Sequence, residues 1–74
     1  MPTITSALMI EFLRSSGFSQ TRQKGSHKFF RHSDGRTATV PFHKGEDPGR
    51  GLTDKILKDV ERTREDFLAW YQRR

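Results

Sequence analysis

The sequence predicts a single α+β domain in the order α-β-β-β-α, with a three-stranded antiparallel sheet covered on one face by helices. Apolar residues recur at helical spacing only near the two ends of the 74-residue chain. Between these ends lie short runs rich in β-branched and aromatic residues, separated by turn signals that contain glycine. Neither layer can bury its apolar side alone, so the helices are expected on one sheet face. The length leaves room for one domain, residues 1–74.

The first helix is predicted over residues 5–16. Apolar residues recur there at the spacing of one helix face: Leu8, Met9, Phe12 and Leu13. Thr5 or Ser6 can cap the start, and Gly17 is the expected left-handed stop. Phe18, just past that glycine, can then fold back onto Leu13.

Three strands are predicted to form an antiparallel meander. Residues 18–24 are polar and suit an edge strand, and Gly25 separates them from the second strand, residues 26–32. The Asp34-Gly35 pair is a strong hairpin turn signal. It leads into the third strand, residues 37–40, which Pro41 limits at its end.

The C-terminal part is predicted to be helical, with a break. Residues 43–51 contain three glycines and a proline and are expected to form a loop. Residues 52–60 place Leu52, Ile56, Leu57 and Val60 on one helix face. Thr63, followed three residues later by Asp66, has the spacing of a capping box and predicts a further helical segment. Its aromatic residues Trp70 and Tyr71 are expected in the core or at a partner interface.

Strand alternation divides the second strand into two faces. His27, Phe29 and Arg31 fall on one face, whereas Ser26, Lys28, Phe30 and His32 fall on the other. One of the two phenylalanines should anchor the core. We favour Phe30, which leaves His27 on the side away from the helices.

The charge distribution favours a polyanionic partner. Fourteen basic and nine acidic residues give a net charge of +5. Residues 1–45 carry seven basic and two acidic side chains, whereas residues 46–74 carry seven of each. Such asymmetry is typical of nucleic-acid binding. No apolar run approaches the roughly 20 residues that a membrane span needs. The sequence therefore predicts a soluble cytoplasmic protein without membrane contact.

The candidate site lies in the run from Lys24 to Phe30. An imidazole gains or loses a proton near neutral pH, so His27 is the candidate general base for RNA cleavage, taking the proton of a ribose 2′-hydroxyl. Lys24 and Lys28 supply positive charge, Gly25 allows a tight turn, and Ser26 orients the imidazole or the phosphate. Further phosphate contacts are expected from three arginines: Arg22, Arg31 and Arg36.

Several alternatives stay open for the neighbouring residues. Phe29 either stacks on an RNA base or packs against the protein. His43, Lys24 or water can supply the general acid. The three histidines lack the spacing and the carboxylates of a zinc site, so no metal or other cofactor is predicted. His32 and His43 are therefore expected to be surface or hydrogen-bonded structural residues, although His43 can come near His27.

Two other function classes fit the same residues. A binding-only module would hold structured RNA through its lysines, with no chemistry at His27. A protein-interaction module would instead present its basic face to an acidic partner. The effect of replacing His27 on RNA cleavage separates the nuclease from the first alternative. A steep salt dependence of RNA binding would favour the first alternative over the second.

The ordered set of motifs resembles the HicA-like (YcfA-like) mRNA interferase toxins of bacterial toxin–antitoxin systems. The resemblance covers roughly residues 5–68. It is carried by Leu13, Gly17-Phe18, Arg22-x-Lys24-Gly25-Ser26-His27, Phe30, His32-x-Asp34-Gly35-Arg36, Thr39-Val40-Pro41-x-His43 and the Gly51-Leu52-Thr53 helix start. The loop from Gly45 to Gly49 departs from the family pattern, because it is acidic and contains proline where the family has a basic loop.

This resemblance implies a fold like that of double-stranded-RNA-binding domains. It also implies metal-independent cleavage of mRNA, with the histidine of the Gly-Ser-His motif, here His27, essential. A HicB-like antitoxin is the implied protein partner, which would cover the active face. Operator DNA would be bound only indirectly, through that antitoxin.

Overall fold

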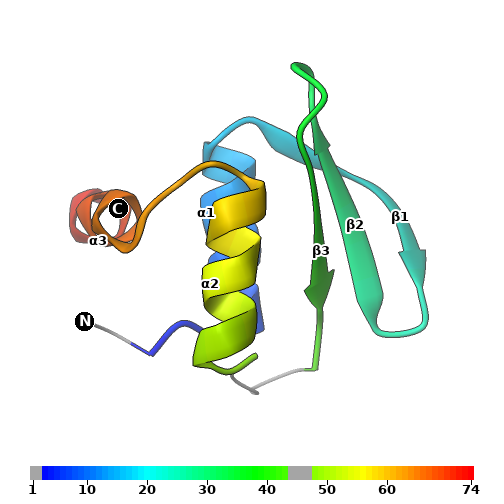
Figure 1. Cartoon of the computed structure of the whole chain (residues 1–74), viewed down its shortest axis with the longest axis horizontal. Helices are drawn as coiled ribbons and strands as arrows, with labels where there is room; N and C mark the ends of the chain where they lie inside the picture. Colours follow the sequence, from blue (N-terminus) through cyan, green and yellow to red (C-terminus); the bar gives the residue numbers. More distant parts are fainter. Residues whose placement is uncertain (1–2, 44–47) are drawn as a thin grey trace.

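The computed structural model describes residues 3–43 and 48–74. The elements follow the order α-β-β-β-α-α, which confirms the predicted α+β class and the break in the C-terminal helical part. In Figure 1, α1 (Ser6–Ser15) and α2 (Arg50–Asp59) overlap in the view and lie between the sheet and α3 (Arg64–Arg73). Among the helices of the described residues, none has the length and apolar character needed to cross a membrane.

Helix α1 begins and ends where its sequence signals predict. The Thr5 hydroxyl accepts a hydrogen bond from the Leu8 N–H at 3.1 Å, which makes Thr5 the N-cap. After the helix, Gly17 adopts φ +93, a conformation that favours glycine. A Cβ at Gly17 would lie 2.8 Å from Nε2 of His32. Glycine is therefore needed here both for the backbone turn and for the close approach of the imidazole.

The sheet is an antiparallel meander in the order β1-β2-β3. Strands β1 (Phe18–Lys24), β2 (His27–His32) and β3 (Thr37–Pro41) match the predicted runs to within one residue at each end. The Gly25-Ser26 pair forms the two-residue turn between β1 and β2, with Gly25 at φ +58. The predicted loop 43–51 is shorter, because α2 begins at Arg50, and residues 44–47, which hold much of its acidic part, lie outside the described residues.

A bulge in β1 changes which side chains share a face. Gln20 pairs with Phe30, but the next paired residue of β1 is Arg22, which lies opposite Phe29, so Thr21 is the extra residue. Because Phe18 is buried, strict alternation from it would place Arg22 and Lys24 toward the helices. The bulge reverses this, and both cations lie on the face away from the helices.

The core lies between the helices and one face of the sheet. Phe30 is 1% exposed and pairs with the buried Ala38 of β3, whereas His27 is exposed. The expectation that Phe30 anchors the core and that His27 points away from it is thus confirmed. The largest fully buried side chains come from both layers: Phe30, Phe67, Met9, Leu13, Ile56, Val40 and Val60.

Two polar arrangements hold the C-terminal elements in place. The Thr63 hydroxyl accepts from the Asp66 N–H at 3.1 Å, and the Asp66 carboxylate accepts from the Thr63 N–H at 2.9 Å, so the predicted capping box starts α3. The turn after β2 is fastened to the end of α2. There, Arg36 donates to the Asp34 carboxylate at 2.8 Å and to the Val60 carbonyl.

We expect the unfolding free energy to decrease in acid because of Asp34 and Asp66. Both carboxyl groups have a pKa that is lowered from the ordinary value of 3.8. The largest cause for Asp34 is the hydrogen bond from the Arg36 N–H, and the largest cause for Asp66 is the hydrogen bond from the Thr63 N–H. A lowered folded pKa gives stabilisation that is complete above the ordinary value and lost as the pH falls through the folded value. Urea unfolding at neutral and at acid pH should therefore show a smaller loss of unfolding free energy for the Asp34→Asn, Asp66→Asn double variant than for the wild type. An equal loss in both proteins would contradict this assignment.

Candidate functional site

The candidate site occupies the sheet face opposite the helices, which we call the open face. His27 is the first residue of β2 and pairs directly with Lys24 across the Gly25-Ser26 turn. Residues that close a two-residue hairpin loop have Cα atoms about 5.5 Å apart and side chains on one face. Both side chains are exposed. An imidazole and an ammonium group therefore stand together on the open face, accessible to a large ligand.

Ser26 lies beside this pair within the turn. Its carbonyl accepts a hydrogen bond from the Phe42 N–H at 2.7 Å, which continues the pairing between β2 and the segment after β3. The residue is half-buried, and its hydroxyl makes no hydrogen bond to the described residues. The hydroxyl is thus available to a ligand bound next to His27.

Phe29 and two arginines continue the open face beyond His27. The Arg22 guanidinium lies 4.6 Å from the centroid of the Phe29 ring, its cross-strand neighbour. Arg31 is exposed two residues further along β2, on the same face. The sequence predicted this alternation for β2, but the placement of Arg22 depends on the bulge at Thr21.

The structure does not bring Lys28 and Arg36, two predicted RNA contacts, to the open face. Lys28 pairs with the buried Val40, and its Nζ lies 4.1 Å from the centroid of the Phe42 ring on the opposite side. Arg36 is half-buried, with its guanidinium held by Asp34 and Val60 and 5.3 Å from the Phe18 ring. Lys28 is separated from His27 by strand alternation, and Arg36 is engaged in stabilising the fold.

Of the two remaining histidines, His32 lies on the face of β2 opposite to His27. Nδ1 of His32 accepts a hydrogen bond from the Asp34 N–H at 3.1 Å, and its ring packs edge-on against Phe18. His32 is thus a hydrogen-bonded structural residue, as predicted. His43 is exposed and lies two residues beyond Pro41, the residue of β3 that pairs with His27.

The electrostatics of the open face are one-sided. The described strands contain no aspartate or glutamate. Arg22, Lys24 and Arg31 form no ion pair with any described residue. Such uncompensated cations attract a polyanion such as RNA. Over residues 3–43 and 48–74, no three His, Cys, Asp or Glu side chains gather in a way that could hold a metal ion.

Comparison with known proteins adds one finding. A family model described as the HicA toxin of bacterial toxin-antitoxin matches residues 8–61, which include α1 from Leu8 onward, the whole sheet and α2. No match was found among the curated proteins. The matched range contains every residue of the candidate site on the open face.

Proposed function

Because the chain belongs to the HicA toxin family and is the toxin of a bacterial toxin–antitoxin system, we propose that it is an endoribonuclease that cleaves mRNA with His27 as general base. Residues 1–74 would act as one toxin domain. The observation that carries the proposal is the pairing of His27 with Lys24 on an exposed sheet face without acidic side chains. This arrangement supplies a proton acceptor and a phosphate-binding cation at one point.

The chemistry follows from the nucleophile that RNA carries. His27 takes the proton of a ribose 2′-hydroxyl, and the oxygen then attacks the adjacent phosphorus. The bond to the 5′-oxygen of the next nucleotide breaks, and that oxygen gains a proton from His43, Lys24 or water. Lys24 stabilises the negative charge that develops on the phosphate oxygens. Ser26, Arg22 and Arg31 bind the flanking backbone, and Gly25 shapes the turn that carries Ser26. This route needs no metal ion.

A HicB-like antitoxin is the proposed protein partner. The family implies an antitoxin, and the uncompensated positive charge of the open face suits an acidic protein surface as well as RNA. An inhibitor bound there would cover His27 directly. Operator DNA would then be contacted only through the antitoxin.

The ends of the cleavage products test the mechanism. Purified toxin incubated with RNA in the presence of EDTA should yield fragments with 2′,3′-cyclic phosphate or 3′-phosphate ends and 5′-hydroxyl ends. Mass spectrometry of the fragments measures this. Fragments with 5′-phosphate ends, or cleavage that stops in EDTA, would remove the general-base role from His27.

A further inference from the structure

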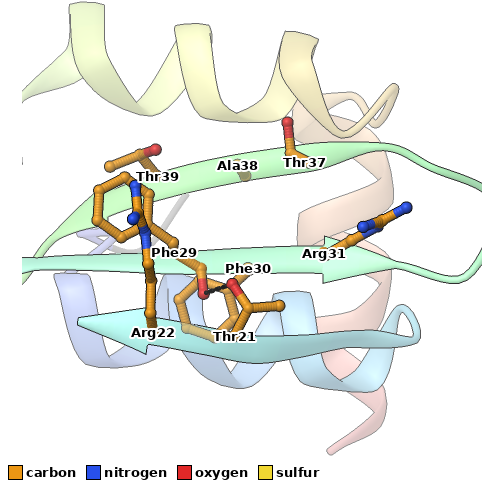
Figure 2. Close-up of a pocket in the computed structure, with 8 residues that line it drawn as sticks. All are labelled: Thr21, Arg22, Phe29, Phe30, Arg31, Thr37, Ala38 and Thr39. Carbon is orange, nitrogen blue, oxygen red and sulfur yellow. Dashed lines mark hydrogen bonds between the residues drawn. The ribbon is translucent and has the colours of Figure 1, made fainter.

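The open face is hollowed next to the proposed cleavage site. A depression of about 360 Å³ lies over the three strands, bordered by Arg22, Phe29, Arg31 and the threonines Thr21, Thr37 and Thr39 (Figure 2). This volume is near the lower end of the range for small-molecule sites, about 300–1,000 Å³. A single nucleotide unit matches the size of this hollow, whereas a nucleic-acid helix is far too wide to enter it.

The Phe29 ring forms one wall of this hollow and has no role in the core. Phe29 is half-buried, yet it belongs neither to the buried core cluster nor to the partly buried apolar residues packed against that cluster. Its ring contacts the Arg22 guanidinium, which crosses it in Figure 2. Aromatic rings and guanidinium planes are the two side-chain surfaces on which RNA bases stack. Here they lie against each other at one edge of the hollow.

The rest of the hollow fits the polar parts of a nucleotide. Arg31 lies at the opposite end from Arg22 (Figure 2), and neither forms an ion pair with a described residue. The two guanidinium groups can therefore bind phosphates on either side of a base. Hydroxyl groups of Thr37 and Thr39 stand on the β3 side and can hydrogen-bond the edge of a base.

The position of Phe29 along β2 connects the hollow to the chemistry. His27, Phe29 and Arg31 alternate along one face, so each is about 7 Å from the next. A base beside Phe29 is thus within one nucleotide of a ribose at His27. Bases inside a duplex stack on one another and are not free to enter a hollow in the protein, whereas bases of a single strand can be splayed out.

We propose that this hollow binds one unpaired base of single-stranded RNA, next to the bond that is cleaved; this proposal rests on the proposed function. The base stacks on Phe29, and Arg22 and Arg31 bind the phosphates on either side of it. The ligand class is therefore single-stranded RNA rather than a duplex, although the fold is of the type found in double-stranded-RNA-binding domains.

RNA binding by variants in a His27→Ala background tests this proposal without requiring cleavage. The probes are a short fluorescein-labelled RNA without self-complementarity and a duplex of the same sequence, compared by fluorescence anisotropy. We expect tighter binding of the single strand. We further expect Phe29→Ala to weaken that binding about tenfold or more and Phe29→Tyr, which keeps the ring, to retain it. Circular dichroism must show that each variant is folded.

Two outcomes would overturn the proposal. One is a folded Phe29→Ala variant that binds the single strand as well as its His27→Ala parent, and the other is tighter binding of the duplex. Failure of the proposed function would appear differently, as wild-type protein that cleaves no RNA. Loss of binding in both Phe29 variants, with the fold intact, would also contradict stacking, because tyrosine preserves the aromatic surface.

Discussion

Replacing His27 by alanine is expected to lower the rate of RNA cleavage by about 100- to 10,000-fold, the usual contribution of a positioned general base. Expression of the variant should then no longer arrest the growth of a bacterial host, whereas the wild type should. The fold should be unaffected, because His27 is exposed and its side chain makes no hydrogen bond to the described residues. Surface changes of this kind usually shift the unfolding free energy by less than about 0.5 kcal/mol.

Lys24 and Lys28 are expected to differ in their effect on cleavage. Lys24 pairs with His27 on the open face, whereas Lys28 lies on the opposite side beside Phe42. Cleavage by Lys24→Ala should therefore fall well below that of Lys28→Ala under the same conditions. Rates measured on one RNA at several salt concentrations separate local charge stabilisation from general attraction. Equal toxicity of wild type and His27→Ala would reject the catalytic assignment, and a larger defect in Lys28→Ala would reject the choice of face.

Signals carried by neighbouring residues made most of the fold predictable. The cap at Thr5, the Asp34-Gly35 turn and the capping box of Thr63 and Asp66 each depend on groups a few residues apart. The helix ends therefore lie within two residues of the predicted ends, and the strand ends within one. Choosing between Phe29 and Phe30 was harder, since both suit a strand. Burial of Phe30 confirms the choice.

The bulge at Thr21 was not predictable from the sequence. Bulges are often marked by glycine, but the bulged residue here is a threonine between Gln20 and Arg22. Alternation alone would have separated Arg22 and Lys24 from His27. Arg22 and Lys24 therefore lie on the open face because of a bulge, and no residue type in the sequence indicates that bulge.

Long-range contacts explain why Arg36, a predicted RNA contact, does not lie on the open face. The guanidinium of Arg36 bonds the carbonyl of Val60, 24 positions away. That contact exists only after α2 packs beside the sheet. From the sequence, Arg36 was equivalent to Arg31, because both are cations near a hairpin. Only the tertiary structure shows that Arg36 is held by the fold and that Arg31 is exposed on the open face.

Replacing Phe30 by alanine is expected to leave the protein largely unfolded. Truncation of a fully buried phenylalanine costs about 3–5 kcal/mol, through lost transfer free energy and the cavity left behind. A single core in a chain of this size seldom supplies more than about 3–5 kcal/mol in total. Phe30 is 1% exposed and packs with Leu13 and Val40 in one cluster. Urea unfolding followed by circular dichroism should show a lost or strongly shifted transition.

Phe29→Ala is the matched control, since it makes the same chemical change one residue earlier on the same strand. Its half-buried ring lies outside the core cluster, so its removal creates no closed cavity and should leave a cooperative unfolding transition. Both variants are expected to bind RNA more weakly, but for different reasons. In Phe30→Ala the binding is lost with the fold, whereas in Phe29→Ala it is weakened with the fold retained. If Phe29→Ala unfolded the protein as far as Phe30→Ala, the assignment of one ring to the core and the other to the ligand would be wrong.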